Sequence, residues 1–192
     1  MDSTISFISL LAYALYFMLP AYMANVSALA FGGGAPVDNK KYFRDGRRLL
    51  GDGVTWRGTI IGIIIGTLIA VIQGIVFMYY GDIFTLIPGW TTLTGVIPNS
   101  YGEWIILGLA LSCGALIGDA AGSFLKRRIN IERGRPAPFL DQLDFVVGAL
   151  ILASLVVTIP LTMILLILIF TAILHLAANS IAYSLGLKNV WY

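Results

Sequence analysis

Long apolar stretches separated by short charged segments govern how this chain can fold. With 58% hydrophobic and only 11% charged residues in 192, against roughly 25% charged in a soluble domain, lipid must be the solvent for much of its surface. An α-helix needs roughly 20 apolar residues to cross the hydrocarbon core of a bilayer. The sequence therefore predicts an all-α integral membrane protein, a single domain with about five transmembrane helices. The predicted spans are residues 5–31, 59–80, 104–124, 143–159 and 161–187.

Two prolines bear on these helices. Pro20 lies inside the first span and predicts a kink there. Pro160 interrupts a stretch from Leu143 to Leu187 in which Asp144 is the only charged residue. A single helix of that length would far exceed a hydrocarbon core of roughly 30 Å. We therefore expect two spans with a tight reversal near Pro160.

The basic residues predict one orientation in the membrane. All but one of the 12 Lys and Arg residues lie in segments 32–57 and 125–142, whereas the connection 81–103 has none. Loops rich in Lys and Arg stay on the cytoplasmic side. We therefore expect both basic segments in the cytoplasm, the N-terminus outside and, after five spans, the C-terminus in the cytoplasm. The expected location is the cell membrane, with an active site on its cytoplasmic face.

Three aspartates near the cytoplasmic ends of the third and fourth spans are the strongest candidates for chemistry. Asp119 ends an otherwise apolar stretch, where an ionisable group is costly and marks function by default. Asp141 and Asp144 share one helical face because they are three residues apart. Carboxylates are the ligands that Mg²⁺ prefers, with substrate phosphates completing its shell, so the three predict a Mg²⁺ site. A salt bridge of Asp119 and helix capping by the other two are the alternatives.

Cations and glycines beside these aspartates are suited to bind phosphate. Ser123, Lys126 and Arg127 follow Asp119 on the same predicted helical face. Segment 32–57 combines basic residues with glycines, whose backbone N–H groups can approach an anion. It lacks the G-x-x-x-x-G-K-[ST] pattern of a P-loop. A flexible loop whose cations meet lipid headgroups is equally compatible with this segment.

Four motifs together resemble the CDP-archaeol synthase family. In order along nearly the whole chain they read P20-AYMANVSALAFGGGAPVD-38, F43-RDGRRLLGDGVTWRG-58, G118-DAAGSFLKRR-128 and D141-QLD-144. The resemblance implies an enzyme that transfers CMP from CTP to 2,3-di-O-geranylgeranylglycerol 1-phosphate, an isoprenoid glycerol-phosphate lipid. The products would be CDP-archaeol and pyrophosphate, and the cofactor Mg²⁺. The chain departs from the family at Val54, where a lysine is common, so no phosphate role is carried over to that position.

The resemblance and the residue types together suggest individual roles. Asp119 and Asp144 would be the main Mg²⁺ ligands, assisted by Asp141. Lys126 and Arg127 would complete the catalytic set by holding the phosphates of CTP or of the lipid. The predicted substrate-binding residues, which shape the nucleotide pocket or hold a phosphate, are Asn25, Arg47, Asp52, Thr55, Trp56, Arg57 and Ser123.

Two other functions remain open from the sequence. A CTP-dependent lipid kinase of the polyprenol type would use similar groups but transfer the γ-phosphate. A small lipid transporter would place polar residues near the bilayer midplane of several spans and carry an inverted repeat, and the ionisable residues here gather at one face instead. No nucleic acid partner is expected, and the oligomeric state is left open.

Overall fold

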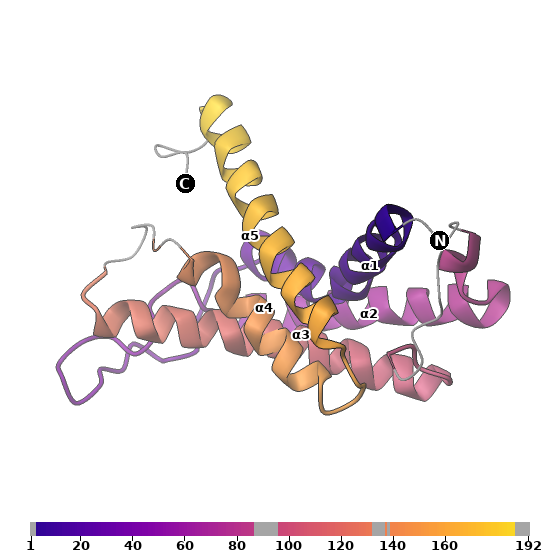
Figure 1. The fold of residues 1–192 in the computed structure, drawn as a ribbon. Helices are drawn as coiled ribbons and strands as arrows, with labels where there is room; N and C mark the ends of the chain where they lie inside the picture. Colours follow the sequence, from indigo (N-terminus) through magenta and orange to yellow (C-terminus); the bar gives the residue numbers. More distant parts are fainter. Residues whose placement is uncertain (1–2, 87–95, 132–136, 138, 187–192) are drawn as a thin grey trace.

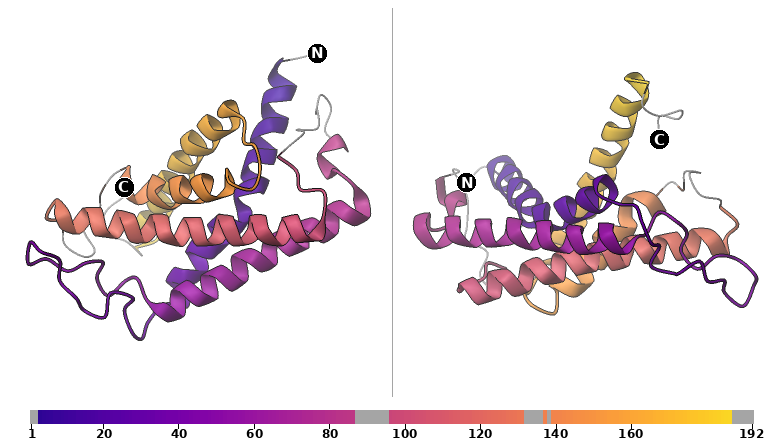
Figure 2. Two further views of the ribbon diagram at one scale, coloured as in Figure 1. Left: turned by 90° about the horizontal axis from the view of Figure 1, so that it is seen from below. Right: turned by 180° about the vertical axis from the view of Figure 1, so that it is seen from behind.

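Helices of very different exposure make up the fold. The structure, a computed structural model, describes residues 3–86, 96–131, 137 and 139–186. The helix α3 packs along α2 and α4, α1 crosses this layer, and α5 leaves it at a steep angle (Figures 1 and 2). The largest fully buried core side chains include Met18 of α1, Leu107 and Leu111 of α3, Val146 of α4 and Met163 of α5. The elements are α1 (Ser3–Ala30), α2 (Trp56–Tyr80), the short 3₁₀ helix η1 (Ile83–Leu86), α3 (Tyr101–Arg128), α4 (Leu140–Ala153) and α5 (Leu161–Ser184).

The prediction of an all-α membrane protein is confirmed, but the fourth predicted span is shorter than expected. α4 has 14 residues, a length of about 21 Å, which is less than the roughly 30 Å hydrocarbon core. Residues 154–160 form no helix, and Pro160 caps the start of α5. The reversal therefore begins several residues before Pro160. The helices long and apolar enough to cross a membrane are Phe7–Ala30, Trp56–Tyr80, Tyr101–Arg128 and Leu161–Ile181.

Small residues let α2 approach α1 closely. A methyl group built on Gly62 would lie 2.7 Å from the carbonyl oxygen of Ala24, and one on Gly58 would overlap the carbonyl oxygen of Ala28. Helices in lipid gain little from hydrophobic burial against one another, so close packing of this kind is what holds them together. The contact brings the end of α1 beside the beginning of α2.

A buried hydrogen bond between α2 and α1 compensates for the proline inside α1. Because Pro20 has no N–H, the carbonyl oxygen of Tyr16 loses its partner within the helix. The buried Gln73 of α2 donates its Nε2 to that oxygen at 2.7 Å. The helix α1 continues through Pro20 to Ala30.

Replacing Gln73 by Leu is expected to destabilise the protein by about 1–3 kcal/mol, since the Tyr16 carbonyl would be left buried without a donor. Thermal unfolding in detergent micelles measures the loss. Pro20→Ala supplies an N–H within α1, so Gln73→Leu should cost much less in that background. Equal losses with and without Pro20 would contradict this explanation.

Candidate active site

The first segment predicted to be cytoplasmic meets the beginning of the second, the end of α3, at one end of the helices (Figure 2). Residues 31–55, called here the basic loop, lie beside the end of α3. Arg47 donates Nη1 to the carbonyl oxygens of Arg127 and Arg128, and Arg127 donates Nε to the carbonyl oxygen of Leu50 at 3.3 Å. The basic loop and the end of α3 therefore form one unit.

A buried aspartate, which the sequence interpretation missed, organises the basic loop. The carboxylate of Asp38 accepts two bonds from the guanidinium of Arg48, at 2.9 and 3.2 Å, and bonds from the backbone N–H groups of Lys40, Leu50 and Gly51. Burial by itself would raise the pKa of Asp38, but these hydrogen bonds outweigh burial and lower the pKa below its usual value. An Asp followed two residues later by a turn is a signal of side-chain-to-backbone bonding, and it could have identified Asp38.

Asp38→Asn is expected to loosen the basic loop. Because folding lowers the pKa of Asp38, its stabilising contribution is fully present above the ordinary value of about 3.9 and is lost as the pH falls below it. Weaker bonding to Arg48 at neutral pH should speed trypsin cleavage after Lys40 and Arg44 by about tenfold, since a hydrogen bond to a charged group contributes about 1.5–3 kcal/mol. Asp52→Asn weakens an exposed ion pair with the same Arg48 and should change the rate little. If trypsin cleaved the Asp38 variant at the wild-type rate, Asp38 would not organise the basic loop.

Thr55 fixes the start of α2 through its hydroxyl oxygen, and its role in the nucleotide pocket stays a prediction. It is buried, and its Oγ1 accepts hydrogen bonds from the N–H groups of Gly58 and Gly33, both at 3.2 Å. The first bond caps α2, and the second holds the glycine-rich segment against the helix end. A helix N-terminus favours anions through its unpaired N–H groups and dipole. Arg57 is exposed in this first turn.

The carboxylate of Asp144 lies against the backbone of α3, near Asp119. A methyl group on Gly122 would lie 2.7 Å from Cγ of Asp144. The charges of Asp119 and Asp144 interact with each other and with that of Lys126. Both aspartates are half-buried. The structure therefore brings together the two residues predicted to be the main metal ligands.

Asp141 has protein partners for both carboxylate oxygens. Oδ1 is 2.6 Å from Nζ of Lys126, and Oδ2 accepts a bond from the backbone N–H of Ala137 at 2.9 Å. Within the described ranges, no three His, Cys, Asp or Glu side chains are grouped so as to hold a metal ion. Mg²⁺ commonly takes one or two carboxylates, water and substrate phosphates, so Asp119 and Asp144 fit this ion. Ligation by all three aspartates stays a prediction.

The arginine side chains at the end of α3 bind to other groups of the protein. Arg127 also donates Nη1 to the carbonyl oxygen of Ile131 at 2.5 Å. Arg128, which the sequence interpretation did not single out, forms an ion pair with Asp45 at 2.5 Å and stacks on the rings of Phe43 and Phe124. The phosphate roles of Arg47 and Arg127 stay predictions. Among the described Lys and Arg side chains, the exposed ones without an ion pair or hydrogen bond are Lys40, Lys41, Arg44 and Arg57.

The remaining predicted substrate-binding residues lie around this end of the bundle. Asn25 is half-buried on α1, and Ser123 is half-buried on α3 directly after Gly122. Trp56 is exposed at the start of α2. Asp52 is exposed and paired with Arg48. The contacts of these four residues within the protein do not test whether they bind substrate.

An apolar groove of about 670 Å³ runs between α3 and α4 and reaches this site. Asp144 is the only ionisable side chain among the described residues that line it. The size lies within the range of ordinary ligand sites. The other lining residues are Ile117, Gly118, Ala121, Gly122, Leu125, Phe139, Leu140, Leu143, Val147, Gly148, Ile151 and Leu152.

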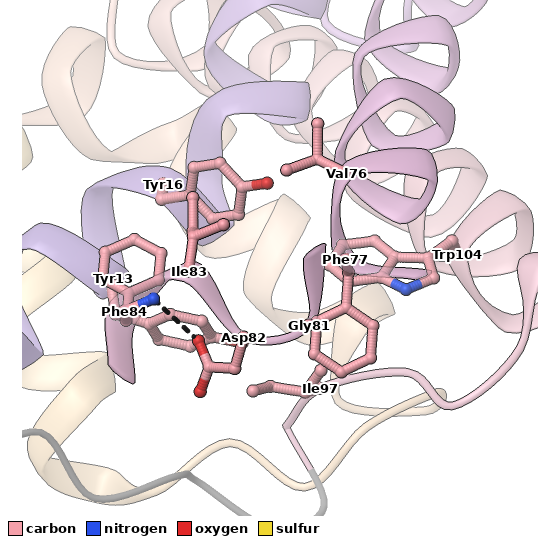
Figure 3. Close-up of a pocket in the computed structure, with 10 residues that line it drawn as sticks. All are labelled: Tyr13, Tyr16, Val76, Phe77, Gly81, Asp82, Ile83, Phe84, Ile97 and Trp104. Atoms are coloured by element: carbon pink, nitrogen blue, oxygen red, sulfur yellow. Dashed lines mark hydrogen bonds between the residues drawn. The ribbon is translucent and has the colours of Figure 1, made fainter. Parts of the chain in front are cut away.

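A second cavity lies at the opposite end, between α1, the end of α2 and α3 (Figure 3). Tyr13, Tyr16, Phe77 and Trp104 surround about 10 Å³ of free space, which is room for a single water molecule. The side chain of Asp82 faces it and accepts a bond from the N–H of Phe84 at 3.0 Å. This cavity is too small for a nucleotide or a lipid.

Comparison with known proteins assigns the family. A family model described as CDP-archaeol synthase matches residues 7–192. The chain belongs to the CDP-archaeol synthase family. The CDP-archaeol synthase of Methanocaldococcus jannaschii is 52% identical over 97% of this chain and 99% of its own length. That of Methanothermobacter thermautotrophicus is 52% identical over 94% and 93%.

A solved structure supports the same assignment. It is described as an intramembrane enzyme for archaeal membrane lipids biosynthesis and is 39% identical, with a TM-score of 0.69 over 86% of this chain and 92% of that one. The predicted class is thereby confirmed: the chain is a CTP-dependent cytidylyltransferase of lipid biosynthesis and a multi-pass membrane protein. A lipid kinase or a transporter does not fit the CDP-archaeol synthase family.

Proposed function

We propose that this enzyme transfers CMP from CTP to an unsaturated ether-lipid phosphate, 2,3-di-O-geranylgeranylglycerol 1-phosphate, where the groove meets the acidic residues. The observation that carries the proposal is that Asp144 is the only ionisable side chain among the described residues lining the groove between α3 and α4, and that its charge interacts with that of Asp119. Isoprenoid chains would lie in the groove while the lipid phosphate reaches the carboxylates. The reaction would thus take place where the apolar groove ends at the acidic residues.

The reaction forms one P–O bond and breaks another. An oxygen of the lipid phosphate bonds to the α-phosphorus of CTP, and the bond from that phosphorus to the bridging oxygen of the β-phosphate breaks. Pyrophosphate leaves with the electron pair of the broken bond. A phosphate monoester is already largely dianionic near pH 7, because its second pKa is about 6, so no protein base is required. The main barrier is the repulsion between two anions.

Asp119 and Asp144 would hold Mg²⁺ at the point where the two phosphates meet. Bound Mg²⁺ would neutralise phosphate charge and stabilise the oxygens of an in-line displacement. Asp141 would orient Lys126 through their 2.6 Å ion pair. The ammonium group of Lys126 would then add positive charge beside the same phosphates.

The first turn of α2 would receive the triphosphate of CTP. Arg57 is an exposed cation in that turn, and Thr55 holds Gly33 against the helix end. Asn25 and Trp56 would contact the nucleoside. We place this end on the cytoplasmic side because loops rich in Lys and Arg stay there and because CTP is a water-soluble substrate.

Labelled CTP tests the proposed reaction. Purified protein in detergent is incubated with Mg²⁺, the geranylgeranyl lipid phosphate and CTP that carries ³²P at either the α- or the γ-phosphate. Label from the α-phosphate alone should enter the lipid, and mass spectrometry should find the cytidine diphosphate ester. Transfer of γ-label to lipid, or no transfer from either position, would reject the proposal. Removal of divalent ions with EDTA should stop the transfer.

A further inference from the structure

Gly122 of α3 lies directly against the side chain of Asp144. A methyl group in place of its hydrogen would overlap Oδ2 of Asp144 and would lie 2.7 Å from Cγ and 2.8 Å from Cβ, closer than real Cβ atoms approach other groups. Four residues earlier, a methyl group on Gly118 would overlap the carbonyl oxygen of Asp144. On this face α3 therefore presents only backbone to the residue.

Asp144 has little freedom to move away from this surface. Its second oxygen, Oδ1, accepts a hydrogen bond from the N–H of Phe145 at 2.7 Å. The helices are also in contact through Gly148 of α4, where a methyl group would lie 2.8 Å from Cα of Gly118. Extra volume at Gly122 would thus have to be taken up by rotation of the Asp144 carboxylate.

We infer that Gly122 is a positioning residue for the cytidylyl transfer. Its missing side chain lets the carboxylate of Asp144 lie flat against α3 on the face that also carries Asp119, since residues three apart share a helical face. The inference rests on the proposed function, in which Asp119 and Asp144 hold Mg²⁺. Gly122 also lines the groove, but in this scheme it contacts neither the metal nor the reacting phosphates and affects them through Asp144.

The same interface provides a matched control. A methyl group on Gly114, about two turns away on α3, would overlap the carbonyl oxygen of Gly148 and lie 2.8 Å from Cα of Ala149. Gly114→Ala thus disturbs the packing of α3 on α4 as Gly122→Ala does. It does so without touching an acidic side chain.

The kinetic test is a Mg²⁺ titration of the initial rate at saturating CTP and lipid phosphate. Gly122→Ala is expected to lower kcat by at least about tenfold, because misplacement of a reacting group by about 1 Å can cost up to 10²-fold. It should also raise the Mg²⁺ concentration for half-maximal rate severalfold. Gly114→Ala should lower the unfolding temperature but leave the Mg²⁺ requirement unchanged. A Gly122 variant with the wild-type kcat and Mg²⁺ requirement would overturn the inference.

A stability cycle covers the case in which Gly122→Ala folds poorly. The variant should lower the unfolding temperature of the wild type but not that of Asp144→Gly, in which the space for the methyl group is already vacant. An equal decrease in both backgrounds would overturn the inference. Full activity of Asp144→Asn would reject the proposed metal site and this inference together. If Asp144→Asn lost activity while Gly122→Ala kept the wild-type kcat and Mg²⁺ requirement, only this inference would be rejected.

Discussion

Replacing Asp119 or Asp144 by Asn is expected to lower turnover by about 10²- to 10³-fold, the usual cost of losing one group that stabilises transition-state charge. The amide keeps the shape of the side chain but removes the negative charge that attracts Mg²⁺. The initial rate of cytidylyl transfer, measured over a range of Mg²⁺ concentrations, is the appropriate readout.

The control for this loss of charge is Asp82→Asn. Asp82 follows α2 at the end opposite the proposed site, where its Oδ1 accepts a bond from the N–H of Phe84. The same chemical change there should leave the rate and the Mg²⁺ requirement unaltered. If the Asp119 and Asp144 variants both retained wild-type turnover, the carboxylates would have no part in the reaction.

Asp141→Asn separates positioning from ligation. Its carboxylate is already engaged by Lys126 and by the N–H of Ala137. We therefore expect a smaller loss of turnover than for Asp119 or Asp144. The Mg²⁺ requirement should change little, because the ion pair with Lys126 is lost while the proposed ligands remain.

The helices could be predicted because hydropathy is a local property of the chain. The length of α4 could not, because residues 154–159 are as apolar as a helix that spans a membrane. Hydropathy indicates that these residues avoid water but does not distinguish a helix from an apolar turn. The backbone N–H groups of Val156 and Val157 bond to the carbonyl of Ala153, so the chain turns within the apolar region.

The candidate site was predicted in its residue types but not in its contacts. Asp119 and Asp144 were found because charges are rare in apolar stretches. The bonds from Arg47 to the end of α3 join residues about 80 positions apart, and no local sequence pattern predicts such bonds. Similarly, Lys126 and Asp141 had separate predicted roles, whereas the structure pairs them. Asp38 was missed because several of its donors are backbone N–H groups, which every residue type carries.

The groove allows a further prediction, for Ala121→Trp. Ala121 is exposed on α3 and lines the groove near Asp144. The indole would fill space that the isoprenoid chains are proposed to occupy, and insertion of such bulk costs up to about 3 kcal/mol. We therefore expect kcat/KM for the geranylgeranyl lipid phosphate to fall by about 100-fold. The loss should reside mainly in KM, because the groove would bind the chains equally in ground and transition states.

A short-chain lipid phosphate and a second tryptophan variant distinguish a blocked groove from a damaged fold. The short-chain substrate in detergent needs little of the groove, so Ala121→Trp should use it almost as well as the wild type does. Ile106→Trp adds the same bulk at another exposed position of α3, outside the groove, and should leave both substrates unaffected. If Ala121→Trp impaired the short-chain and long-chain substrates equally, the chains would not lie between α3 and α4. Because the lipid tails of the bilayer are as apolar as the groove, little hydrophobic energy favours entry of the chains. The groove would therefore act by aligning the lipid phosphate with Asp144, and shape rather than apolarity would decide which lipid is used.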